Sequence, residues 1–176
     1  MLSYRDLIDF AEKLCSDAEV SSNEDHGTAY LIGSILNSWM AMESFINNMM
    51  NDFASLPDDI FTTHERGFLE ERRVRFIDNG KEAGRFHLEN STDYKRLEDK
   101  ILFLIARFGK SKRIDKGHAL WQRFERIKIK RNAIAHPRRS KLTTLETKDA
   151  REAISVAKEV ISLVSKEVWK RPVVWD

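Results

Sequence analysis

Arg131, Asn132 and His136 lie within one short segment, and their side chains are suited to chemistry on a phosphate group. A guanidinium can neutralise charge on phosphoryl oxygens, and an imidazole can move a proton near neutral pH. Asn132 stands one helical turn before His136, where its amide could orient the imidazole ring. An Arg/His pair by itself is weak support for a site, because a histidine at a helix end is often only a cap.

The position of His136 relative to Arg131 depends on how their helix ends. Five residues on an ideal helix correspond to about 140° around its axis, so the two side chains would point in different directions. Pro137 follows His136, and the residue before a proline is pushed out of helical geometry. We therefore expect the chain to bend at His136, which would let the imidazole turn back towards Arg131.

Two charged residues interrupt stripes of apolar residues that repeat at helical spacing. Glu43 falls in the stripe of one expected helix, and Arg131 falls in the stripe of another. A lone buried charge is costly, so each residue should have a partner or face water. The simplest interpretation is that the two helices face each other and that Glu43 approaches Arg131 in one site. The alternative is a buried structural ion pair, or a stripe whose edge is wet.

Basic residues surround the Arg/His segment. Residues 126–141 include no acidic residue, and residues 107–116 have only Asp115 to offset their cations. If both segments meet around His136, they form a phosphate-binding surface on a nearly neutral protein. The alternative is a solvated helix face, which a run of charges usually is. The candidate phosphate-binding cations are Lys128, Lys130, Arg138, Arg139 and Lys141.

The elements that position these residues are expected to be helices. Seven glycines and three prolines are too few for the turns of a β-sandwich. Apolar residues instead recur with the helical period along most of the chain. We predict an all-α fold, a single-domain helical bundle of five or six helices that covers residues 1–176. The expected helices span about 3–19, 26–53, 64–78, 91 or 92 to 108, 117–135 and 147–169, with an irregular connection at 80–90.

Some local features make these predictions more specific. Ser3 and Asp6 resemble a capping box at the start of the first helix. Trp175, near the end of the chain, could seal either the bundle or a dimer. The expected helix at 64–78 is heavily charged, and its predicted ion pairs join Glu70 to Arg73 and Glu71 to Arg75. The methionines predicted to fill the core are Met40, Met42, Met49 and Met50.

Composition limits the class of protein. The net charge is only +2, so attraction to nucleic acid must come from a local patch. A single cysteine, Cys15, excludes an internal disulfide and a Cys-based zinc site, and it suits a reducing cytoplasm. The N-terminus lacks the residue order of a signal peptide, and the polar residues within 28–50 would be costly in lipid. We therefore expect a cytoplasmic protein without a metal, a cofactor or a membrane segment.

Residues 131–136 (Arg-Asn-Ala-Ile-Ala-His) resemble the Arg-x4-His signature of the HEPN superfamily, including the polar residue that its ribonuclease members carry after the arginine. The segment ends a late helix and precedes a loop and a final amphipathic helix, as in the family. Residues 39–47 look like the family's long early helix, and residues 69–77 resemble the charged helix that follows it in some branches. The resemblance covers most of the chain, although only the hexapeptide is specific.

The resemblance implies a symmetric homodimer with two Arg-x4-His motifs across a shared cleft. It also implies a metal-independent endoribonuclease whose nucleophile is the RNA 2′-hydroxyl, leaving a 2′,3′-cyclic phosphate and a 5′-hydroxyl. By motif, Arg131 would hold the scissile phosphate, His136 would be the acid or base, and Asn132 would position His136 or the substrate. Glu43 joins this candidate site from the stripe argument above, and the candidate cations would bind RNA.

Many similar proteins are toxins or antiviral effectors, encoded beside a neutralising antitoxin or another partner. In one branch of the family, the antitoxin modifies a tyrosine two residues after the histidine. Arg138 occupies that position here, so control by that modification is not expected.

Two other functions remain open from the sequence. The first is a non-catalytic HEPN module that dimerises or binds a partner or a nucleotide; loss of cellular toxicity on His136→Ala would separate it from a nuclease. The second is a helical regulator that binds nucleic acid. The sequence shows no convincing helix-turn-helix pair with a short glycine-containing turn, which counts against the second.

Overall fold

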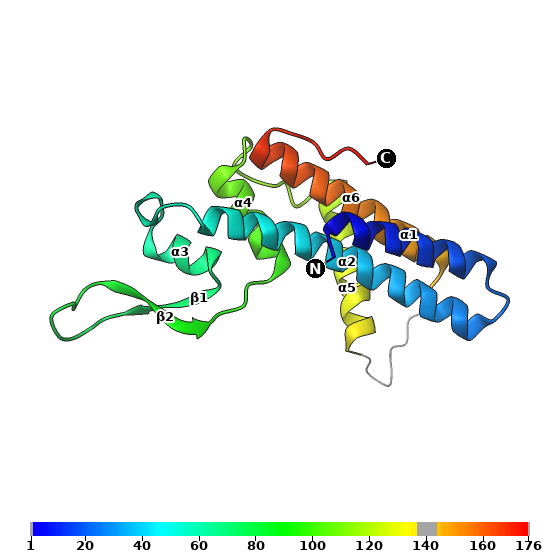
Figure 1. Cartoon of the computed structure of the whole chain (residues 1–176), viewed down its shortest axis with the longest axis horizontal. Helices are drawn as coiled ribbons and strands as arrows, with labels where there is room; N and C mark the ends of the chain where they lie inside the picture. Colours follow the sequence, from blue (N-terminus) through cyan, green and yellow to red (C-terminus); the bar gives the residue numbers. More distant parts are fainter. Residues whose placement is uncertain (1, 137–143, 176) are drawn as a thin grey trace. The chain divides into compact units, whose positions relative to one another are not determined.

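The computed structural model describes residues 2–136 and 144–175, and over these residues the protein is mostly helical (Figure 1). The described residues form six α-helices, one short 3-10 helix and a two-stranded antiparallel sheet. Within the same ranges, no helix combines the length and the apolar character needed to cross a membrane. The elements are α1 (Tyr4–Val20), α2 (Glu24–Ala54), η1 (Asp58–Ile60), α3 (Thr63–Leu69), β1 (Arg72–Phe76), β2 (Phe86–Thr92), α4 (Leu97–Phe108), α5 (Ala119–Ala135) and α6 (Thr147–Trp169).

The chain divides into two compact units. The first, here called the helix unit, comprises Met1–Phe45 with Ile105–Asp176. The second, here called the ribbon unit, comprises Ile46–Leu104. Helices α2 and α4 each contribute residues to both units, and the mostly helical character agrees with the predicted fold class.

In the helix unit, α6 packs against both α1 and α5 (Figure 1). Helix α1 begins at the predicted capping box, in which the Ser3 hydroxyl accepts from the Asp6 N–H (3.2 Å) and the Asp6 carboxylate accepts from the Ser3 N–H (2.8 Å). Surface ion pairs add to the apolar contact, including one between Lys158 of α6 and Glu12 of α1 at 2.6 Å. The predicted stripe of α6 is buried throughout: Ala150, Ala153, Ile154, Ala157, Val160, Ile161, Val164 and Val168.

Two further expectations concern single residues. Trp175 packs within the chain: its indole N–H donates to the Ser162 hydroxyl (2.9 Å), and its ring meets that of Tyr4 edge-on. Met40 is half exposed and does not fill the core as predicted, because it follows Trp39 on α2 and points away from the buried side. The other predicted core methionines, Met42, Met49 and Met50, are buried.

The ribbon unit departs from the predicted helix at 64–78. Helix α3 ends at Leu69, and Glu71 has a positive φ (51°), a backbone conformation that a helix cannot contain. Residues 72–76 then form β1, where basic and apolar side chains alternate with the period of a strand. The predicted ion pairs do not form; Glu70 instead pairs with Arg72 (3.0 Å), and Glu71 pairs with Lys100 (2.9 Å).

The predicted irregular connection at 80–90 is also wrong in part, because residues 86–92 form β2. In the antiparallel register, Val74 lies opposite Leu88, and these two side chains rest on α3 at Gly67. A Cβ at Gly67 would lie 2.5 Å from a methyl group of Val74, so glycine permits this close approach. Because the residues around 91 pair in β2, α4 begins only at Leu97 and not near 91 as predicted.

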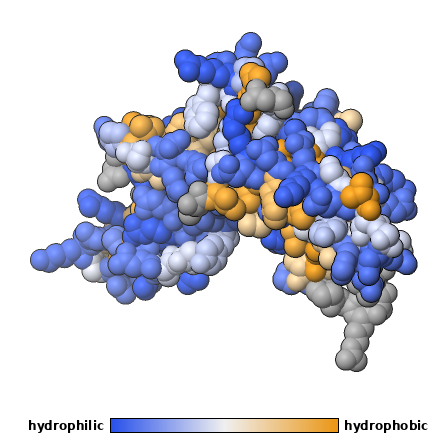
Figure 2. Space-filling view, turned by 45° about the vertical axis from the view of Figure 1, so that its right-hand side comes forward, coloured by the Kyte–Doolittle hydropathy of each residue, from blue (hydrophilic) through white to orange (hydrophobic). Residues whose placement is uncertain are grey.

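The face of the molecule in Figure 2 is largely hydrophilic, with apolar side chains gathered in part of it. The hydrophilic surface agrees with the composition of the chain, in which 33% of residues are charged.

Candidate functional site

Helix α5 supplies the Arg-x4-His segment and ends where the sequence predicts. Its first turn is capped by His118, whose Nδ1 accepts from the Leu120 N–H at 3.3 Å. At the other end, His136 is the C-cap residue, with φ −130° and ψ 66°, and its backbone N–H donates to the Asn132 carbonyl at 3.0 Å. The buried side of α5 carries Trp121, Phe124 and Ile127.

Glu43 of α2 lies beside Arg131 of α5, as predicted. Their closest charged atoms, Arg131 Nη2 and Glu43 Oε1, are 3.9 Å apart. The side chains are 29% and 39% exposed, so the pair is not a buried structural ion pair; a stripe with a wet edge, the other form of the alternative, matches this exposure. A guanidinium in this position can exchange its carboxylate neighbour for a phosphate from solution.

Trp39 is the functional candidate that the sequence reasoning missed. Its indole N–H donates to Glu43 Oε1 at 2.7 Å, and the Arg131 guanidinium lies over its ring, 5.7 Å from the centroid. The ring in turn stacks on Phe124, with centroids 5.4 Å apart. Trp39 therefore fixes both partners of the charged pair. The available signal was its position four residues before Glu43, which places both side chains on one helix face.

Asn132 joins this group, and His136 does not. Arg131 Nη1 donates to Asn132 Oδ1 at 3.2 Å. Among the described residues, no hydrogen bond links the His136 imidazole to Arg131 or Asn132, and both His136 and Asn132 are exposed. The predicted bend of the imidazole back to Arg131 is therefore not observed, and Pro137, on which it depends, lies outside the described residues.

The candidate RNA-binding cations on α5 have acidic neighbours, one on the same helix and one on α6. Lys128 pairs with Glu125 one turn earlier, at 2.5 Å. Lys130 hydrogen-bonds to Asp149 of α6, a residue that is only 7% exposed. Burial alone would raise the pKa of Asp149, but the Lys130 hydrogen bond, a backbone N–H and nearby ammonium charges hold it below its ordinary value. Arg138, Arg139 and Lys141 lie outside the described residues.

Within the described residues, contacts from the two basic segments lie near opposite ends of α6. Lys130 contacts Asp149 at the start of α6, whereas Lys110 and Ser111 donate backbone N–H groups to Glu167 near its end. At 1.5 Å of rise per residue, the two contacts are about 27 Å apart along α6.

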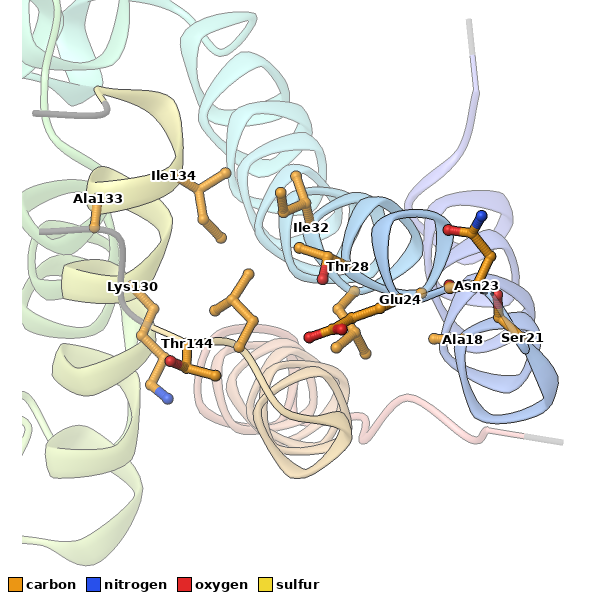
Figure 3. A pocket seen from close by; sticks show the side chains of 13 residues that line it. Ala18, Ser21, Asn23, Glu24, Thr28, Ile32, Lys130, Ala133, Ile134 and Thr144 are labelled. Atoms are coloured by element: carbon orange, nitrogen blue, oxygen red, sulfur yellow. Dashed lines mark hydrogen bonds between the residues drawn. The ribbon is translucent and has the colours of Figure 1, made fainter. Parts of the chain in front are cut away.

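A hollow of about 620 Å³ lies against the face of α5 that carries Ala133 and Ile134. Figure 3 shows Ile32 of α2 and Ile134 of α5 on opposite sides of this hollow. Ala133 and Lys130 also line it, whereas Arg131, Asn132 and His136 do not. Two apolar residues of the hexapeptide, Ala133 and Ile134, thus face the hollow, and its polar residues lie elsewhere.

Together these features define a mostly helical protein with an arginine–carboxylate–indole cluster beside an exposed asparagine and histidine. Comparison of the chain with protein-family models, curated proteins and solved structures gives no significant match. The HEPN resemblance accordingly depends on the motif and on its place in the helix order.

Proposed function

We propose that the protein is a metal-independent endoribonuclease of the HEPN type, with Arg131 and His136 as its central residues. The observation that carries this proposal is the fixed position of the Arg131 guanidinium. Trp39 and Glu43 hold it at a water-exposed edge, with Asn132 beside it and His136 at the end of the same helix.

In this mechanism, Arg131 binds a non-bridging oxygen of the scissile phosphate and stabilises the charge that develops there. The His136 imidazole takes the proton from the 2′-hydroxyl, whose oxygen then forms a bond to phosphorus. The bond from phosphorus to the 5′-oxygen breaks, and that oxygen takes a proton from a second acid. The products are a 2′,3′-cyclic phosphate and a 5′-hydroxyl. Glu43 acts as a positioning residue, because it orients the guanidinium until the phosphate arrives.

In a homodimer the two motifs would share one cleft, and a water molecule bound there would be the second acid. Two observations are compatible with a dimer at this place. Ile129, which lies on the same face of α5 as Asn132 and His136, is largely exposed, and Met40 of α2 is half exposed. In the cell, we expect such an enzyme to act in the cytoplasm as a toxin or antiviral effector that a neutralising partner restrains.

The deciding experiment is cleavage of total RNA and transfer RNA by the purified protein in EDTA. Wild type is compared with Arg131→Ala, His136→Ala and the matched control His26→Ala, which removes an exposed histidine of α2 outside the cluster. We expect cleavage with cyclic-phosphate ends by wild type and His26→Ala, and none by the other two. A folded wild type that leaves every RNA intact, or an active His136→Ala, would overturn the proposal.

A non-catalytic module is the second candidate, favoured by one observation. Among the described residues, no hydrogen bond links the His136 imidazole to Arg131, as a catalytic pair within one chain would have it. Growth of cells that express wild type or His136→Ala separates the candidates. A nuclease is toxic only with the histidine intact, whereas toxicity that survives the substitution, or is absent from both, favours the module.

A further inference from the structure

The free end of the β1–β2 ribbon carries an uncovered group of aromatic rings. Phe76 and Phe86 stand opposite each other in the register, with ring centroids 5.4 Å apart. Although both are core-type residues, they are 51% and 48% exposed. The imidazole of His64, from α3, lies 4.4 Å from the Phe86 ring and is also exposed. We call these three residues the ring cluster.

The ring cluster is exposed because α3 covers only part of its face of the ribbon. Side chains two residues apart on a strand share a face, so Phe76 lies on the same face as Val74, and Phe86 on the same face as Leu88. Val74 and Leu88 rest on α3 at Gly67. Beyond them, His64 of α3 contacts the Phe86 ring, and both phenylalanine rings remain about half exposed, at a cost that a binding surface would explain.

Basic side chains accompany the ring cluster. Arg73 and Arg75 alternate with the apolar residues of β1 and therefore point to the opposite face, and Lys81 and Arg85 lie in the connection between the strands. Within the described part of the chain, Arg73, Lys81 and Arg85 form no ion pair, and Arg75 has only a loose contact with Glu89 at 3.8 Å. Residues 72–92 carry more Lys and Arg than Asp and Glu.

Exposed rings and basic side chains on the same two-stranded ribbon fit single-stranded nucleic acid. Unpaired bases stack on aromatic rings regardless of sequence, and arginines follow the phosphates. The ribbon is only two strands wide, about 5 Å between strand axes, so long arginine side chains can reach its edges. We infer that the ring cluster is a stacking surface for unpaired bases of RNA, held by the ribbon arginines. The choice of RNA rests on the proposed function, whereas the stacking surface itself does not.

The experiment measures binding without cleavage. Full-length protein carrying His136→Ala is titrated into a fluorescently labelled, unstructured single-stranded RNA, and anisotropy reports the dissociation constant. Adding Phe86→Ala should weaken binding about tenfold or more, as loss of one stacked base does elsewhere. Arg85→Ala should weaken it less and lower the salt dependence by about 0.7 in the log–log slope. Phe10→Ala is the matched control, because Phe10 on α1 is equally exposed (48%) and should have no effect.

A conservative pair keeps the test decisive if Phe86→Ala disturbs the ribbon. Phe86→Trp keeps an aromatic ring and should bind as tightly as its parent, whereas Phe86→Leu keeps apolar bulk and should bind about as weakly as Phe86→Ala. Equal RNA binding by the leucine and tryptophan variants would overturn the inference, because stacking requires an aromatic ring. Equal binding of a duplex and the single strand would overturn it as well, because paired bases cannot stack on the rings.

The two proposals fail separately. If ribbon variants lose RNA binding but no RNA is ever cut, only the proposed function falls. If wild type cuts RNA and the ribbon variants bind normally, only the stacking surface falls.

Discussion

Lys130→Ala should destabilise the protein far more than its place among the candidate RNA-binding cations suggests. The Lys130 ammonium hydrogen-bonds to Asp149, whose side chain is 9% exposed. Without the lysine, a carboxylate remains in a nearly buried position with a hydrogen bond from the Glu146 N–H (3.1 Å) and no side-chain partner among the described residues. Leaving a buried charged group without its partner costs more than the pair itself is worth.

The expected loss is about 2 kcal/mol in the free energy of unfolding, the middle of the range for an unsatisfied buried polar group. For a domain of this size, that loss lowers Tm by about 4–8 °C. The control is Lys148→Ala on the same helix, since Lys148 pairs with Glu146 at 2.7 Å but both side chains are more than half exposed. We expect this control to unfold close to wild type.

Urea denaturation followed by circular dichroism measures both variants, and a cycle with Asp149→Ala isolates the pair. The double variant should lose less than the sum of the single losses, because it leaves no unpaired charge. A Lys130→Ala protein as stable as Lys148→Ala would refute the reasoning. If the prediction holds, weaker RNA binding by Lys130→Ala would partly reflect a disturbed helix end and could not be read as loss of a phosphate contact.

Three further predictions follow from other contacts. Trp39→Phe removes the hydrogen-bond donor to Glu43 but keeps an aromatic ring on Phe124. It should lower the free energy of unfolding in urea by about 1 kcal/mol and slow RNA cleavage. Added to Glu43→Ala, it should slow cleavage no further. The hydrogen bond from Arg123 lowers the pKa of Glu152 below its ordinary 4.5. The Glu152 carboxylate therefore stabilises the fold above pH 4.5, and this contribution is lost as the pH falls through the lowered pKa. The free energy of unfolding measured against pH should show this loss, and Arg123→Ala should make that pH dependence weaker. Gly67→Ala should cost about 1–3 kcal/mol, measured by thermal unfolding, because its Cβ meets Val74 and the Arg72 carbonyl.

The helices of the helix unit could be predicted because their sequence signals are local and long. The predicted limits of α6 match the structure, and its apolar period continues through more than five turns. The approach of Glu43 to Arg131 was also predictable, since each was a charge inside an apolar stripe and the two needed a common explanation. Signals of this kind require no knowledge of the tertiary contacts.

The ribbon and the acidic partners could not be predicted from the same signals. In residues 70–75, opposite charges stand three and four residues apart, which is the spacing of ion pairs on a helix. The strand β1 is only five residues long, so its alternating pattern is a weaker signal. The contact that favours the strand, Val74 and Leu88 against Gly67, joins three separate segments. Lys130 likewise pairs with a carboxylate on the next helix, a contact that the basic run in the sequence does not indicate.

The directions of Arg131 and His136 bear on whether one chain or two make the active site. Arg131 points to Trp39 on α2, while no hydrogen bond among the described residues links the exposed His136 imidazole to Arg131. If one site combines Arg131 of one copy with His136 of the other, mixing inactive Arg131→Ala and His136→Ala chains should restore cleavage. Random pairing makes half of the dimers mixed, each with one intact site of two, so about a quarter of wild-type activity should return. If each chain makes its own site, the mixture stays inactive, because no chain in it carries both residues.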